Sequence, residues 1–183
     1  LISTVLSKEY NVLYTLGNLN NHIGVPLTLL RLNRSHNIAV VEMGANHPEE
    51  IAFLCKIARP NFGIITNVGK AHLEGFGSFE GVKKTKGELY EWIAGVDGKI
   101  FLHADNPHLC EMVYSGTLFP PVISTSTSSV TEFSNGLETI KYGEAGDNFV
   151  SGKIISCTPY INVNLNLNGN ASGENQTYEI NTQ

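Results

Sequence analysis

The chain has 183 residues, of which 42% are hydrophobic and 16% charged, so it suits one domain with an apolar core and is not a wholly disordered protein. Its net charge of −5 argues against a nucleic-acid binder with a broad basic surface. The cysteines are too far apart for a metal site or a disulfide framework, and no apolar run is long enough for membrane insertion, which together predict a cytoplasmic protein.

The first third of the chain predicts two short strands and three helices. Residues 1–10, LISTVLSKEY, resemble the last turns of a helix, as if the chain were excised from a longer protein, and residues 11–14 predict a strand. Asn20 and Asn21 follow in a turn-forming stretch, where they are either plain loop residues or amides that face a polar ligand. Pro26 suits the first turn of the next helix.

A buried strand is predicted at residues 38–41, because this run is apolar throughout. Asn46 is expected to cap the helix that follows, with Pro48 in its first turn and Pro60 beyond its end. Glu42 lies between the strand and this helix.

The stretch 62–88 predicts a strand, a glycine-rich loop and a helix, and we expect the site here. The strand covers residues 62–66, the loop carries Asn67 and His72, and the helix runs from about residue 78 to 93. Lys86 shares the apolar helix stripe of Val82, Leu89 and Ile93. A lysine there either snorkels, pairs with a carboxylate or is chemically altered.

Residues 99–102 predict a further strand, followed by His103, Asp105 and a short helix to Tyr114. This alternation predicts an α/β fold with a doubly wound, mostly parallel sheet flanked by helices. Glu42, Asn67, His103 and Asp105 all follow strand ends, where such sheets bind ligands.

Beyond residue 116 the pattern changes to alternating strands, at 139–142, 149–155, 160–167 and 177–182. They predict a small antiparallel β-sheet appended to the parallel part. We therefore expect a parallel α/β part at 1–118 and an antiparallel subdomain of the same domain at 119–183.

Four motifs in order, TLGNLNNHIGVPLTLL, VVEMGANHPEEI, ITNVGKAHLEGFGSFEGVKKTKGE and FLHADNPHL, resemble the central ATPase domain of the Mur ligases. The resemblance implies an ADP-forming acid–amino-acid ligase that uses ATP and Mg²⁺ in peptidoglycan synthesis. The forms NHIGVPLTLL and AHLEGFGS favour the member that joins D-alanyl-D-alanine to UDP-MurNAc-tripeptide through an acyl phosphate.

The resemblance also implies roles for single residues. Glu42 and His72 match metal-site residues, and Lys86 matches the lysine that the family carries as a carbamate, a third ligand for Mg²⁺. Asn67, His103 and Asp105 fall on the nucleotide side, where the family usually has Asn in place of His103. The pair Asn20 and Asn21 falls on the UDP-substrate side.

The chain departs from the family at both ends. The phosphate loop G-x-x-G-K-[ST] is expected before Leu1, and a C-terminal domain beyond Gln183, so we expect the chain alone to be inactive and to bind ATP weakly. Two alternatives remain open, a sister Mur or folyl-polyglutamate-type ligase and a non-catalytic UDP-sugar-binding module.

Overall fold

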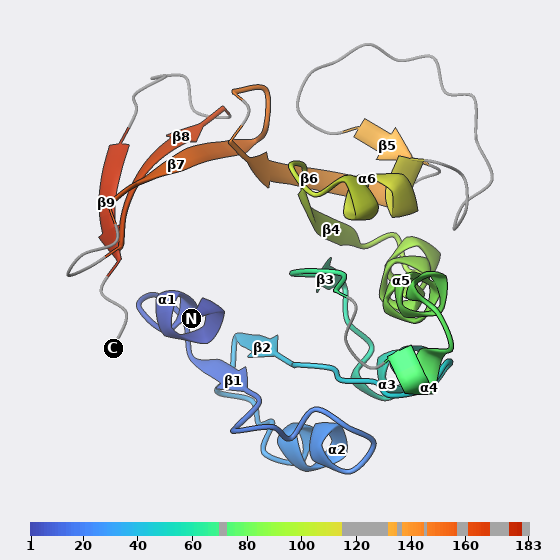
Figure 1. The fold of residues 1–183 in the computed structure, drawn as a ribbon. Helices are drawn as coiled ribbons and strands as arrows, with labels where there is room; N and C mark the ends of the chain where they lie inside the picture. The colour runs from blue at the N-terminus through green and yellow to red at the C-terminus, as the bar shows by residue number, and fades with distance from the viewer. Residues whose placement is uncertain are drawn as a thin grey trace. The chain divides into compact units, whose positions relative to one another are not determined.

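The computed structural model describes residues 1–69, 73–114, 132–134, 137–144, 146–156, 161–168 and 176–180 (Figure 1). The chain divides into two compact units, which are described separately below. The first contains residues 1–60 and 69–92, and the second residues 61–68 and 93–183. In the part of the chain that the structure describes, no helix is both long and apolar enough to cross a membrane.

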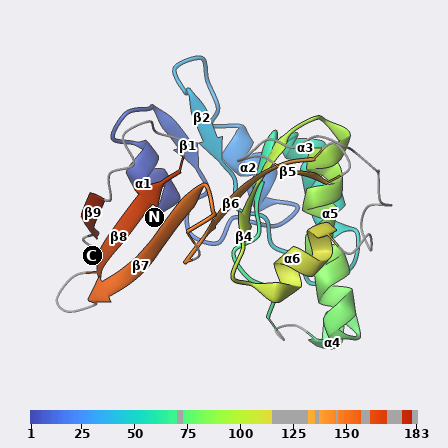
Figure 2. The same ribbon diagram turned by 90° about the horizontal axis from the view of Figure 1, so that it is seen from above.

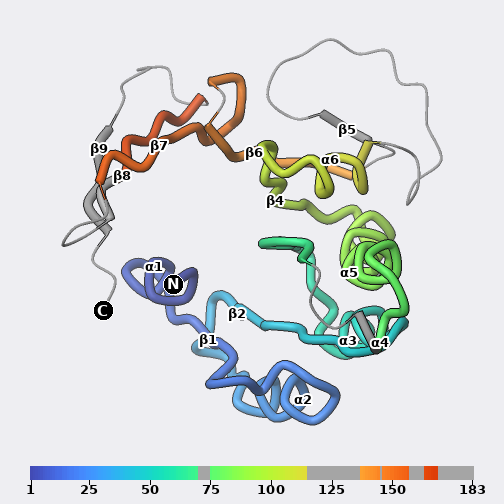
Figure 3. The backbone as a smooth tube through the Cα atoms, viewed as in Figure 1, coloured from blue at the N-terminus to red at the C-terminus, as the bar shows by residue number. Residues whose placement is uncertain are grey.

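The first unit is built from short strands and helices that alternate along the chain. In order they are α1 (Ile2–Leu6), β1 (Val12–Tyr14), α2 (Gly24–Leu29), β2 (Ile38–Val40), α3 (Glu50–Ala58), α4 (Leu73–Phe76) and α5 (Phe79–Gly95), whose last residues belong to the second unit. Strands β1 and β2 pair in parallel, with Leu13 opposite Ala39. Figure 3 follows the backbone from β1 through a loop into α2.

The core of the first unit lies between α2, α3 and α5. Val25, Ile51, Leu54 and Cys55 are buried together. Leu89 and Trp92 of α5 pack against this cluster, and the Trp92 indole N–H donates to the Pro60 carbonyl at 3.1 Å. The apolar stripes of α3 and α5 therefore face the same core, as the helical spacing predicts.

Helix α3 begins later than the sequence predicts, and Asn46 does not cap it. The helix starts at Glu50, preceded by Glu49 in the left-handed region at φ 69°. The Glu50 carboxylate accepts hydrogen bonds from the backbone N–H groups of Asn46 at 2.6 Å and His47 at 3.1 Å. These bonds, the one from Asn46 foremost, lower the pKa of Glu50. They hold the segment that precedes the helix, whereas the N–H groups at the helix start bond to Glu88 of α5.

In the residues that the structure describes, the second unit contains a seven-stranded mixed sheet and a helix that packs on it. Parallel pairs join β3 (Phe62–Ile64), β4 (Lys99–His103), β6 (Leu137–Gly143) and β7 (Val150–Ser156) in that order. Antiparallel pairs add β8 (Ile161–Leu167) and β9 (Gln176–Ile180) beyond β7, and β5 (Glu132–Ser134) beside β6. Figure 2 shows β7 and β8 side by side.

Helix α6 (Pro107–Tyr114) covers β4 in this sheet. Ile100 and Leu102 of β4 are fully buried, as are Leu109 of α6 and Leu137 of β6. The alternation of β4 leaves Lys99, Phe101 and His103 half-buried on its other face.

The expected mixed α/β fold, mostly parallel with an antiparallel part, is confirmed. Two details differ from the expectation. The strands β1 and β2 form a sheet of their own, and the antiparallel strands continue the sheet of β3, β4 and β6. The division into 1–118 and 119–183 stays a prediction.

Candidate functional site

The predicted site residues lie in both units, and each group is described within its own unit. The first unit holds Glu42, Lys86, Asn20 and Asn21, and the second holds Asn67, His103 and Asp105. His72 lies outside the described residues.

Glu42 comes two residues after the end of β2 and is held by two hydrogen bonds. Its backbone N–H donates to the Thr15 hydroxyl at 2.9 Å, and its Oε1 accepts from the Asn20 Nδ2 at 2.7 Å. The residue is exposed, so its carboxylate is open to solvent cations. Of the two asparagines expected on the substrate side, Asn20 thus contacts the expected metal ligand.

Asn21 stabilises the start of α2. Its Oδ1 accepts hydrogen bonds from the backbone N–H groups of Ile23 at 3.1 Å and Gly24 at 2.9 Å. These donors have no partner inside the helix, and asparagine is among the side chains best suited to satisfy them. The side-chain oxygen of Asn21 therefore stabilises the N-terminus of α2.

Lys86 lies on α5 between residues that confirm the predicted stripe. Val82 is 2% exposed and Ile93 is fully buried, while Lys86 itself is half-buried. Burial lowers the pKa of the Lys86 ammonium from its ordinary value. A larger share of this lysine is therefore the neutral amine, the form that reacts with CO₂.

Helix α5 is fixed to α3 by a residue that the sequence did not single out. The Glu88 carboxylate accepts from the backbone N–H of Glu49 at 2.7 Å and of Ala52 at 2.9 Å, so it caps the N-terminus of α3 from another helix. Burial raises the pKa of the Cys55 thiol to about 12, and the nearby charge of Glu88 adds to this rise. That thiol stays protonated and acts as a core residue.

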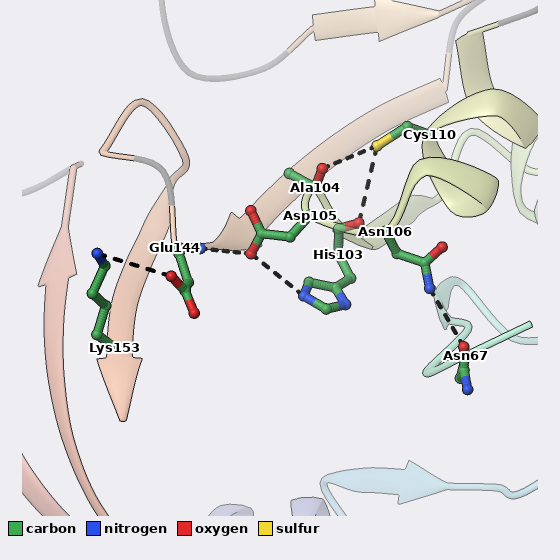
Figure 4. Close-up of polar contacts among 8 residues, drawn as sticks. All are labelled: Asn67, His103, Ala104, Asp105, Asn106, Cys110, Glu144 and Lys153. Atoms are coloured by element: carbon green, nitrogen blue, oxygen red, sulfur yellow. Dashed lines mark hydrogen bonds and ion pairs between the residues drawn. The ribbon is translucent and has the colours of Figure 1, made fainter. Parts of the chain in front are cut away.

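In the second unit, His103 and Asp105 form a connected group at the carboxyl end of β4 (Figure 4). His103 Nε2 lies 3.5 Å from Asp105 Oδ2, which also accepts the backbone N–H of Glu144 at 2.7 Å. A Cβ on Gly143 would lie 2.5 Å from that same oxygen, so a side chain at residue 143 would displace the carboxylate from this position.

Tyr142 and Asn106 join this group, and neither was predicted from the sequence as a site residue. The Tyr142 ring stacks on His103 with centroids 5.1 Å apart and planes 6° apart, since the two residues are paired across β4 and β6. The Asn106 Nδ2 donates to Asn67 Oδ1 at 3.4 Å (Figure 4). The Asn106 Oδ1 accepts from two backbone N–H groups in the first turn of α6. Strand pairing, which brings these residues together, leaves no local mark in the sequence.

Glu42 suits a magnesium ion as a single carboxylate ligand. Mg²⁺ is held in proteins through one or two carboxylates, with waters and phosphates as its other ligands. Among the residues that the structure describes, no three His, Cys, Asp or Glu side chains gather as a metal cage. The donor chemistry of Glu42 therefore fits this metal.

Comparison with known sequences points to one family. The family profile described as the Mur ligase middle domain matches residues 1–178. The UDP-N-acetylmuramoyl-tripeptide–D-alanyl-D-alanine ligase of Escherichia coli is 49% identical over 104 residues, which are 57% of this chain and 23% of that protein. The ligase of that name from Haemophilus influenzae is 51% identical over 98 residues, 54% of this chain and 21% of that protein.

Solved structures agree with this assignment. A crystal structure of MurF from Acinetobacter baumannii superposes with a TM-score of 0.75 at 27% identity, over 98% of this chain and 34% of that one. The crystal structure of MurF ligase from Thermotoga maritima in complex with ADP superposes with a TM-score of 0.73 at 26% identity. The match covers 97% of this chain and 36% of that one. This chain spans about a quarter of the length of the curated relatives it matches. The chain belongs to the Mur ligase middle-domain family.

Proposed function

We propose that this chain is the middle domain of an ATP-dependent ligase that joins D-alanyl-D-alanine to UDP-MurNAc-tripeptide through an acyl phosphate. The observation that carries the proposal is the identity of 49% over 104 residues to a protein named for that reaction. The matched residues make up 23% of the length of that relative. We place the ligase in the cytoplasm, because the cysteines form no disulfide framework in the sequence.

The nucleotide is assigned to the carboxyl ends of β3 and β4 in the second unit. Ligands of open α/β sheets bind at this edge. His103 is the last residue of β4, Asp105 comes two residues after it, and Asn67 comes three residues after the end of β3. A stacked pair of rings next to two amides and a carboxylate offers both a flat surface and polar contacts, which a nucleotide uses. A relative of 26% identity was solved with ADP, which supports ATP as the nucleotide here.

The metal site is assigned to Glu42, His72 and a carbamate on Lys86. The neutral amine of Lys86 adds to CO₂ and loses a proton, so a cation becomes an anion with two oxygen donors. Mg²⁺, when bound, neutralises charge on the phosphates and on the acyl oxygen. Asn21 lies on the loop assigned to the UDP-substrate side, where its Nδ2 is the group available for a contact.

The reaction itself is tested by ADP release from the ligase that contains this chain. We expect ADP only when ATP, Mg²⁺, UDP-MurNAc-tripeptide and D-alanyl-D-alanine are all present, with one amide formed per ADP. Tight binding of the UDP substrate without ADP formation would favour a non-catalytic module. ADP release with glutamate and a folate in place of the two substrates would favour the sister ligase.

The nucleotide assignment predicts a role for the Tyr142 ring. Tyr142→Leu removes the surface on which His103 stacks, and we expect the KM for ATP to rise about three- to tenfold, since aromatic pairs contribute about 0.5–1.5 kcal/mol. Tyr142→Phe keeps the ring and should leave this KM nearly unchanged. Steady-state kinetics at saturating concentrations of the other substrates measures the difference. An unchanged KM for ATP in Tyr142→Leu would place the nucleotide elsewhere.

A further inference from the structure

We propose that Asn20 is a positioning residue for the metal ligand Glu42, and that its side chain acts through this carboxylate rather than on the UDP substrate. The inference rests on the proposed function, because that function makes Glu42 a metal ligand. It concerns the loop between β1 and α2 and the residues that follow β2, all within the first unit.

Two hydrogen bonds join Asn20 to the segment that carries Glu42. The Asn20 Nδ2 donates to Glu42 Oε1 at 2.7 Å, and the backbone N–H of Gly44 donates to the Asn20 carbonyl at 2.7 Å. Asn20 is thus bonded to this segment twice, through its side chain at Glu42 and through its backbone at Gly44. Thr15, which accepts the Glu42 N–H at 2.9 Å, provides a third point of attachment.

The loop that carries Asn20 is itself fixed in place. The backbone N–H of Leu19 donates to the Leu16 carbonyl at 3.2 Å, and that of Asn20 to the Asn18 carbonyl at 2.8 Å. The loop also packs tightly on the first turn of α2, because a Cβ on Gly24 would lie 2.3 Å from the Leu19 backbone. Asn20 is therefore presented by a rigid turn, which positioning requires.

Gly44 completes the arrangement by leaving room for the amide. A Cβ at Gly44 would lie 3.0 Å from three atoms of the Asn20 carboxamide, closer than such atoms normally approach. Any side chain at residue 44 therefore presses on the group that holds Glu42. The contact between Asn20 and Glu42 depends on this glycine as well as on the asparagine.

The chemistry of an amide donor suits a carboxylate that binds a cation. The Asn20 N–H group orients Glu42 Oε1 without adding charge, so the carboxylate keeps its full attraction for Mg²⁺, whereas a lysine or arginine donor would oppose it. Hydrogen bonds that orient a metal ligand are commonly worth 10- to 100-fold in metal affinity. The exposed Glu42 is a flexible side chain that gains from such a restraint.

The test measures Mn²⁺ binding by the ligase that contains this chain, by calorimetry or by the electron paramagnetic resonance signal of free Mn²⁺. We expect Asn20→Ala to weaken Mn²⁺ binding about 10- to 100-fold. Asn18→Ala removes another amide from the same loop and should leave Mn²⁺ affinity unchanged, since Asn18 is exposed. The affinity for UDP-MurNAc-tripeptide without metal should stay the same in Asn20→Ala, as should the melting temperature within a few degrees.

Gly44→Ala tests the same contact from the other side. Alone it should weaken Mn²⁺ binding, because the added methyl group displaces the Asn20 amide. In the Asn20→Ala background it should have no further effect, since the group it displaces is gone; such non-additivity is the signature of a shared contact.

The outcomes separate this inference from the proposed function. Wild-type protein that binds no Mn²⁺ and releases no ADP would overturn both. Wild-type activity with equal Mn²⁺ affinity in Asn20→Ala would overturn the positioning role alone. A loss of UDP-substrate affinity in Asn20→Ala, with Mn²⁺ affinity intact, would make Asn20 a substrate contact instead.

Discussion

Lys86→Arg should lower turnover of the ligase that contains this chain by more than about 100-fold. Loss of a group that only orients a metal ligand typically costs about 10- to 100-fold, so the loss of a ligand itself should exceed that range. Lys86 lies half-buried on the apolar stripe of α5, where burial lowers the pKa of its ammonium. Arginine keeps a positive charge and cannot form a carbamate, so it places a cation where an anion is required. Stopped assays of ADP and of the amide product measure the loss.

Two companion measurements separate the carbamate role from a plain cationic role. Lys86→Ala should be equally inactive, and short-chain carboxylates should restore part of its activity by occupying the vacated space, but should not restore Lys86→Arg. A carbamate carbon should also appear in the ¹³C spectrum of wild-type protein supplied with labelled bicarbonate. Near-normal turnover in Lys86→Arg would show that the ammonium, or no charge at all, suffices.

The lowered pKa of Lys86 also predicts a pH dependence of stability. Below the lowered pKa the side chain is charged in both states, and the unfavourable burial of its charge is present in full. Between that pKa and the ordinary value of 10.5, the unfolded chain binds more protons than the folded one, so stability rises with pH. Lys86→Met should remove this rise, which urea unfolding in CO₂-free buffer at several pH values can follow.

The parts of the fold that were predictable are those encoded by local periodicity. The stripe of Val82, Lys86 and Ile93 gave α5 and its buried face, and apolar runs gave β2, β3 and β4 close to their true bounds. The alternation of strands and helices predicts that the strands run parallel, but it does not predict which strands pair with each other in a sheet. For that reason the separate pairing of β1 with β2 could not be derived.

The parts of the site that were missed depend on contacts between distant segments. Tyr142 meets His103 only because β6 pairs with β4, 39 residues apart in sequence at this register. Asn20 was expected to face a substrate, and nothing near it in the sequence indicates the bond to Glu42. The start of α3 shows the same limit, because the local sequence suggests Asn46 as the cap, whereas the N–H groups of Glu49 and Ala52 bond to Glu88, 39 and 36 residues away.

Glu88→Ala should lower the free energy of unfolding of the first unit by about 2–4 kcal/mol, because it removes the acceptor of two backbone N–H groups. The Glu88 carboxylate accepts from Glu49 and Ala52 at 2.7 and 2.9 Å, and both donors belong to the N-terminus of α3, which favours a negative charge. Glu88→Gln keeps one acceptor oxygen and loses the charge, so its effect should be about half as large.

Glu80→Ala provides the matched control on the same helix. The Glu80 side chain is 75% exposed and pairs at 3.3 Å with Lys83, whose side chain is only 9% exposed. Its removal takes one partner from a buried lysine, so some stability should be lost, but the two bonds from Glu88 to α3 stay in place. Urea unfolding gives the stability of each variant, and hydrogen exchange at the Ala52 amide reports on α3 directly. The exchange should accelerate in Glu88→Ala and stay unchanged in Glu80→Ala. Equal stability and equal exchange in the two variants would mean that the carboxylate of Glu88 does not hold α3 to α5 in solution.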